Sequence, residues 1–163
     1  MSICYFLSSD MELRAVNNTQ IEFLSIEEAE YRGLVLPNWY SKDMNINRTE
    51  KNVLFAPNEE SMHEIQISDD NDSTYAKQYS NKRYHSALQW HYSEKRAQQL
   101  KEYIMEHLMT GSEIELWNIW LDGYGKPTIK RCPIDSLTIS DIKETVEQNP
   151  YENPCCLIVY KST

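Results

Sequence analysis

The sequence predicts a single α+β domain, with a mainly antiparallel sheet and helices on one face of it. Its length of 163 residues suits one domain. A hydrophobic fraction of 40%, with eleven tyrosines and four tryptophans, is enough for a folded core. Strand and helix patterns alternate through the C-terminal half without long interruptions. A division into residues 1–82, as N-terminal strands and a cap, and residues 83–163 is the alternative to one undivided domain.

The first elements are a strand and a short helix. Residues 3–7 form a continuous apolar run, which is typical of a strand buried on both faces. Ser25 is followed three residues later by Glu28, the pattern of a capping box. We therefore expect a short helix that runs to about Arg32 and ends at Gly33.

The middle of the chain is predicted to contain a hairpin and a long loop. Residues 37–51 are polar and irregular, and we expect Trp39 and Tyr40 within them to pack onto the core. Residues 52–56 and 62–68 read as two strands joined by a turn, which indicates a hairpin. Residues 69–82 are acidic at first and then rich in Tyr, Ser, Asn and Lys, and the interpretation is a long surface loop.

The C-terminal half begins with a strand and a well-defined helix. Apolar and polar residues alternate from Tyr84 to Tyr92, as expected for a strand. Ser93 then caps a helix to about Met109, in which apolar residues recur every three or four positions and form one buried stripe. Leu100 and Ile104 belong to this stripe.

A strand, a turn, a strand, a helix and a strand follow. The strands are residues 113–122, 128–132 and 155–161, the turn at 122–126 suggests a hairpin, and the helix begins at Thr138 or Ser140. Residues 84–161 thus read β-α-β-β-α-β, the order of the ferredoxin-like unit, in which both helices cover one face of an antiparallel sheet. The N-terminal half would add strands and a short helix.

The net charge is −9, and it is unevenly distributed. Residues 52–76 carry −6 and no basic residue, whereas residues 77–101 carry +5. A negatively charged protein repels phosphate, so nucleic acid is excluded as a general partner. The acidic segment instead suggests a docking surface for a basic protein. The candidate residues are Glu59, Glu60, Glu64, Asp69, Asp70 and Asp72.

The expected compartment is the cytoplasm. The N-terminus lacks the pattern of a signal peptide, and no stretch approaches the roughly 20 apolar residues that a membrane helix requires. Cys4, Cys132, Cys155 and Cys156 are therefore expected to be reduced. Cys155 and Cys156 are adjacent in a strand, so their side chains should point to opposite faces.

No residue pattern predicts a metal or a cofactor. His85 and His91, with Glu94 nearby, span about 20 Å along a strand, which is too far for a single ion. The cysteines lack metal-binding spacing. Residues 122–127 contain two glycines and a lysine but precede a strand, whereas a phosphate-binding loop precedes a helix.

Two functions remain open. The leading hypothesis is a non-enzymatic protein that binds a basic protein, such as an immunity protein or inhibitor that neutralises a cationic toxin. The alternative is an enzyme or a small-molecule-binding protein whose site lies between the two halves of the chain. His63, His85, His91 and Cys132 are its candidate residues.

Overall fold

A computed structural model describes residues 2–37, 46–123 and 125–163. The chain divides into two compact units: unit 1 comprises residues 1–18 and 64–163, and unit 2 comprises residues 19–63. The elements of unit 1 are β1 (Ile3–Ser9), β2 (Val16–Asn17), β5 (Gln66–Asp69), α2 (Thr74–Tyr79), β6 (Tyr84–Gln89), α3 (Glu94–His107), β7 (Glu113–Trp120), β8 (Thr128–Pro133), η3 (Ile134–Ser136), α4 (Ile139–Glu147) and β9 (Cys155–Tyr160). Those of unit 2 are β3 (Glu22–Leu24), α1 (Ile26–Tyr31), β4 (Val53–Phe55) and η2 (Glu60–Met62).

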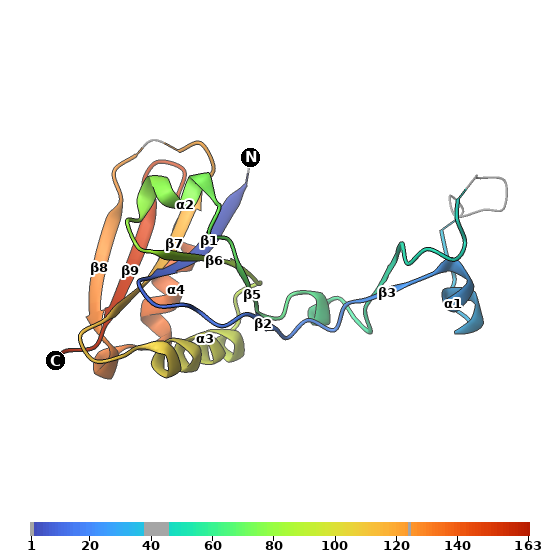
Figure 1. The fold of residues 1–163 in the computed structure, drawn as a ribbon, viewed down its shortest axis with the longest axis horizontal. Coiled ribbons are helices and arrows are strands. Elements are labelled where there is room, and N and C mark those ends of the chain that lie inside the picture. The colour runs from blue at the N-terminus through green and yellow to red at the C-terminus, as the bar shows by residue number, and fades with distance from the viewer. Residues whose placement is uncertain (1, 38–45, 124) are drawn as a thin grey trace. The chain divides into compact units, whose positions relative to one another are not determined.

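Unit 1 contains a seven-stranded, mostly antiparallel sheet in the order β2-β5-β6-β1-β7-β9-β8 (Figure 1). Strand β8 runs parallel to β9. All other neighbouring strands of this sheet pair antiparallel. The N-terminal strand β1 lies in the middle of the sheet, where it pairs with β6 and β7. The predicted α+β class, with a mainly antiparallel sheet, is confirmed at this level.

The ferredoxin-like arrangement of residues 84–161 is not confirmed. The elements occur in the predicted order, but β7 and β8 do not pair with each other, because β9 lies between them. The expected hairpin at residues 122–126 is therefore wrong. Strands β6 and β7 are separated by β1, whereas β8 and β9 are adjacent and connected through α4. In a ferredoxin-like unit both β-α-β connections are split by a strand of the unit itself, whereas β8 and β9 have no strand between them and β6 and β7 are separated by a strand from outside residues 84–161.

Gly125 lies in the connection between β7 and β8 and approaches another loop closely. A Cβ atom at this position would lie 1.5 Å from the backbone oxygen of Glu152. Such an approach is open only to glycine. The glycine thus permits a close crossing of two connections, and it does not form the predicted hairpin turn.

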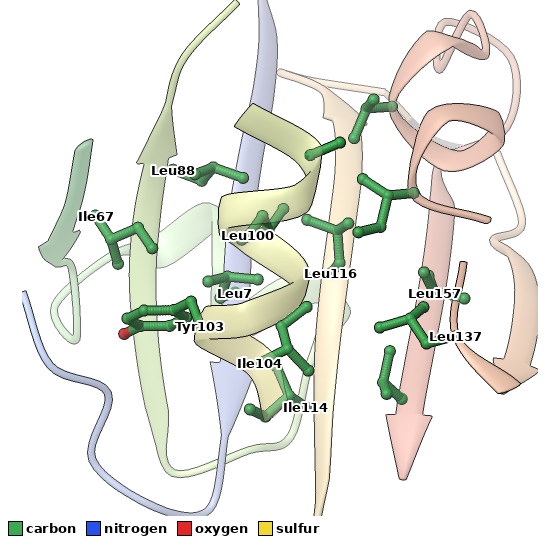
Figure 2. Close-up of a cluster of buried hydrophobic side chains, with 14 of the residues drawn as sticks. Leu7, Ile67, Leu88, Leu100, Tyr103, Ile104, Ile114, Leu116, Leu137 and Leu157 are labelled. Atoms are coloured by element: carbon green, nitrogen blue, oxygen red, sulfur yellow. The ribbon is translucent and has the colours of Figure 1, made fainter. Parts of the chain in front are cut away.

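Helices α3 and α4 cover one face of the sheet, as predicted. Leu100 and Ile104 of α3 are fully buried, and they pack with Leu7, Leu116 and other apolar side chains of the strands. Figure 2 shows α3 lying across these strands with its apolar side chains directed at the sheet. Ser93 caps α3 through a hydrogen bond from the backbone N–H of Arg96, which confirms the predicted start of the helix.

The opposite face of the sheet is covered in part by α2, which the sequence interpretation missed. The surface loop expected for residues 69–82 is wrong in part, because Ser73 caps a six-residue helix within them. Ala76 of this helix is buried against Phe6 and Trp117, whose rings stack with centroids 5.8 Å apart. Helices therefore lie on both faces, because the apolar residues of the central strands need cover on each side.

The described part of unit 2 contains a two-stranded sheet, the helix α1 and the short 3-10 helix η2. Strands β3 and β4 pair antiparallel, and Leu24, Ile26, Ala29 and Val53 form its small core. The capping box at Ser25 is confirmed, since both of its hydrogen bonds are present. The hairpin predicted for residues 52–68 is wrong: β4 pairs with β3, whereas β5 pairs with β2 and β6 in unit 1. Trp39 and Tyr40 lie outside the described residues.

Candidate functional site

The six acidic residues proposed for partner binding belong to two different units. Glu59 and Glu60 are exposed residues at the start of η2 in unit 2. Glu64, Asp69, Asp70 and Asp72 belong to unit 1. The six residues therefore do not belong to one compact unit.

Two of the four acidic residues in unit 1 hold local structure together. Glu64 pairs with the buried Arg96 of α3, with Oε2 and Nε 3.3 Å apart. Asp70 accepts a hydrogen bond from the hydroxyl of Tyr75. Burial, together with this hydrogen bond, raises the pKa of Tyr75 to about 12. Asp69 and Asp72 are exposed, so these two remain accessible to a partner.

Unit 2 is the more acidic of the two units for its size. Its 45 residues contain eight acidic and four basic side chains, which gives a net charge of −4, and the 118 residues of unit 1 carry the remaining −5. Its described basic residues, Arg32, Arg48 and Lys51, are each paired with a glutamate. Among the described residues, Glu27, Glu50 and Glu59 are acidic, exposed and without a basic partner.

One face of the two-stranded sheet of unit 2 presents two partly exposed apolar side chains. Phe23 and Leu54 are direct register partners on β3 and β4, and they are 56% and 47% exposed. The next pair in the register, Leu24 and Val53, is buried in the core of the unit. Because side chains alternate along a strand, Phe23 and Leu54 lie on the opposite face of the sheet from this core. Exposed apolar surface with a charged border is typical of protein-binding sites.

Sequence reasoning missed Phe23 and Leu54. Val53-Leu54-Phe55 is an uninterrupted apolar triplet, which is usually interpreted as a strand buried on both faces. Two features of the sequence could have identified the site: the apolar runs of β3 and β4 are short, and many glutamates surround them in the chain. A segment of this size has too few residues to cover both faces of a sheet.

His85 lies in a buried polar row that crosses three strands of unit 1. Ser8 of β1 is the register partner of His85 on β6 and of Glu115 on β7. The hydroxyl of Ser8 and Nδ1 of His85 are 2.7 Å apart, and Glu115 accepts a hydrogen bond from the indole of Trp117. Burial lowers the pKa of His85, as does the nearby Lys77. The row resembles a serine–histidine pair, but Ser8 is fully buried and cannot meet a substrate.

The other residues of the enzyme hypothesis are not brought together with His85. Cys132 packs in the core on the α3 and α4 side of the sheet, whereas His85 faces Phe6 on the opposite side. Burial and the carboxylate of Asp141 raise the pKa of the Cys132 thiol, which disfavours a nucleophilic thiolate. His91 lies beyond the end of β6, and His63 belongs to unit 2.

A cavity of about 360 Å³ lies near the carboxyl ends of β8 and β9 in unit 1. Lys82, one of its lining residues, bridges Asp10 and Glu113 at 3.3 and 2.8 Å. Arg131 pairs with the same Glu113 and lies over the ring of Tyr160. Asp10 and Glu113 offset the charges of Lys82 and Arg131, and the exposed Lys161 leaves the lining side chains at a formal +1.

Comparisons with known proteins identify no relative. No protein-family model matches the chain, and no curated protein or solved structure matches it. Within the described residues, no three His, Cys, Asp or Glu side chains are grouped so that they could hold a metal ion. No helix in the described part of the chain has the length and apolar character needed to cross a membrane.

Proposed function

We propose that this chain is a non-enzymatic protein that binds a basic protein partner through unit 2. The observation that carries the proposal is the exposed register pair of Phe23 and Leu54 on one face of the sheet in an acidic unit. An immunity protein or inhibitor that covers the cationic surface of a toxin is the biological role that fits this chemistry best. We place this activity in the cytoplasm, in keeping with the four free thiols.

The apolar pair would supply most of the affinity. When a partner covers these two side chains, each Å² of apolar surface removed from water contributes about 25 cal/mol of favourable free energy. Anchors of this kind, at the centre of an interface, typically dominate the binding free energy. A two-stranded sheet is marginally stable by itself, so a partner that covers the second face would also stabilise unit 2.

The acidic side chains would act mainly on the rate of association. Glu27, Glu50 and Glu59 are exposed and have no basic partner among the described residues, so their field extends into solvent. Complementary charge speeds encounter and rejects partners of the wrong sign. Salt screens this field over about 8 Å at physiological ionic strength, so association should slow as salt is added.

The first experiment combines capture from native cells with binding kinetics of the recovered partner. We expect the partner to be basic and Phe23→Ala/Leu54→Ala to weaken binding by roughly tenfold or more, because each truncated anchor costs over about 1 kcal/mol. The matched control is Ile129→Ala, a side chain of unit 1 that is 53% exposed. An acidic partner, or equal affinity of the double variant and the control, would reject the proposal.

The second experiment separates the two groups of acidic residues. Glu59→Lys/Glu60→Lys changes unit 2, and Asp69→Lys/Asp72→Lys makes the same change in charge at exposed positions of unit 1. We expect the unit 2 variant to associate several-fold more slowly at low salt and to respond less to salt. The unit 1 variant should remain closer to the wild type. If the unit 1 variant is the slower one, the docking surface lies in unit 1.

A further inference from the structure

We propose that a groove in unit 1 receives one long cationic side chain, lysine or arginine, from a basic protein. The groove has a volume of about 230 Å³ and lies between α3 and the strands β2 and β5. All of its lining residues belong to unit 1. The inference adds a second contact to the proposed function and rests on it for the source of the side chain.

The groove has an apolar floor. Ile65 directly precedes β5, Ile67 belongs to β5, and Leu100 and Tyr103 belong to α3. All four residues are at least 94% buried. Figure 2 shows Tyr103 extending from α3 toward the side of the sheet where Ile67 lies. An aliphatic stem of three or four methylene groups can pack against such a floor while its charged head remains at the rim.

The rim offers more hydrogen-bond acceptors than donors. Glu102 and Glu106 are exposed and lie four residues apart on α3, where two like charges repel each other. Glu102 accepts a hydrogen bond from the amide of Gln98 at 3.2 Å and has no basic partner among the described residues. Gln99 also lines the groove, and its buried Oε1 has no donor. A guanidinium or ammonium group at the rim supplies donors to the exposed carboxylate of Glu102.

The chain's own Arg14 demonstrates that a guanidinium suits this rim. Its Nη2 atom lies 3.3 Å from Oε2 of Glu106. The backbone of Arg14 is held against α3, because its carbonyl accepts a hydrogen bond of 2.6 Å from the hydroxyl of Tyr103. Arg14 therefore neutralises only one of the two carboxylates. The lining remains at −1, which repels an anion and attracts a second cation.

The test is a titration of the isotope-labelled full chain, followed by NMR. N-acetyl-arginine methylamide is the probe, and N-acetyl-norleucine methylamide is the uncharged control of similar length. With the arginine probe, we expect saturable shifts of the Gln99 side-chain amide and the methyl groups of Ile67 and Leu100. The norleucine probe should give markedly smaller shifts. Equal shifts with both probes would reduce the site to an apolar crevice and overturn the proposal, as would no shift with either probe.

Two variants assign the charge. Glu102→Gln keeps the size of the side chain. It should lower the affinity for the arginine probe by roughly two- to fivefold, as expected for the loss of one exposed ion pair. Glu94→Gln, at the exposed start of the same helix and outside the groove, should leave the affinity unchanged. Equal affinities in the two variants would overturn the proposed recognition of a cation.

Further arms separate this inference from the proposed function. N-acetylagmatine carries the guanidinium head and the same single positive charge without a peptide backbone, and tighter binding of N-acetylagmatine than of the capped residue would mean that the groove takes a small guanidinium compound. That result would overturn a docking role. Phe23→Ala/Leu54→Ala should not alter the titration, because both residues belong to unit 2. The titration can therefore refute cation binding in the groove while partner binding through unit 2 persists, and the reverse also holds.

Discussion

Replacing Leu100 by alanine should destabilise unit 1 by about 3 kcal/mol. Leu100 is completely buried between α3 and the sheet (Figure 2). The substitution removes three methylene-sized groups at about 0.8 kcal/mol each, and the remaining cavity raises the total toward the observed range of about 2–5 kcal/mol. Leu100 also lines the groove beside β2 and β5, so neighbouring side chains have room to relax. We therefore expect a value in the lower half of that range.

The measurement is urea unfolding followed by tryptophan fluorescence. Trp90, Trp117 and Trp120 belong to unit 1, so a Trp39→Phe background restricts the signal to that unit. Met105→Ala is the matched control, since Met105 is on the same helix and 51% exposed, and it should cost less than about 0.5 kcal/mol. A Leu100→Ala effect as small as that of the control would mean that the stripe of α3 does not face the core.

Three further results are expected. Asn118→Ala should cost about 1–3 kcal/mol in the same urea assay, because the buried amide of Asn118 donates to three carbonyls near the end of α4 at 2.9–3.4 Å. Gly125→Ala should cost more than about 2 kcal/mol, since its Cβ would overlap the backbone of Glu152, and unchanged stability would place this connection elsewhere. The folded-state pKa of His85 lies below its usual 6.5, so the stability that neutral His85 contributes is complete above pH 6.5 and is lost as pH falls through the lowered value. His85→Gln should reduce that loss between pH 7 and 5, and an unchanged pH profile would contradict the burial of His85.

Local interactions made the helices predictable. Ser25, Ser93 and Thr138 each accept a hydrogen bond from a backbone N–H three residues later, and this pattern is visible in the sequence itself. Helix α2 was missed although Ser73 caps it in the same way. It has six residues and buries only Ala76, so no apolar stripe identifies it.

The order of the strands depends on contacts that are distant in the sequence. The apolar run of β1 correctly indicated a strand buried on both faces, but it did not indicate which strands lie beside it. Pairing with β6 and β7 places β1, a strand from outside residues 84–161, between the two strands that α3 connects. The same limitation applies to the candidate site: Phe23 and Leu54 are exposed because unit 2 has one layer of cover, which periodicity alone does not reveal.

Because the chain divides into two compact units, removing unit 2 tests whether the partner binds there. None of the described residues of 19–63 belongs to either apolar cluster of unit 1, so unit 1 should fold without unit 2. The backbone N–H of Asn18 donates to the carbonyl of Ile65 at 2.9 Å, and a short glycine–serine turn can therefore replace the whole segment. Closing a shorter loop also costs less entropy. We expect this shortened chain to unfold in urea within about 1 kcal/mol of the full chain in the Trp39→Phe background and to titrate with the arginine probe as before. It should lose its partner, and a shortened chain that still binds with full affinity would place the docking surface in unit 1.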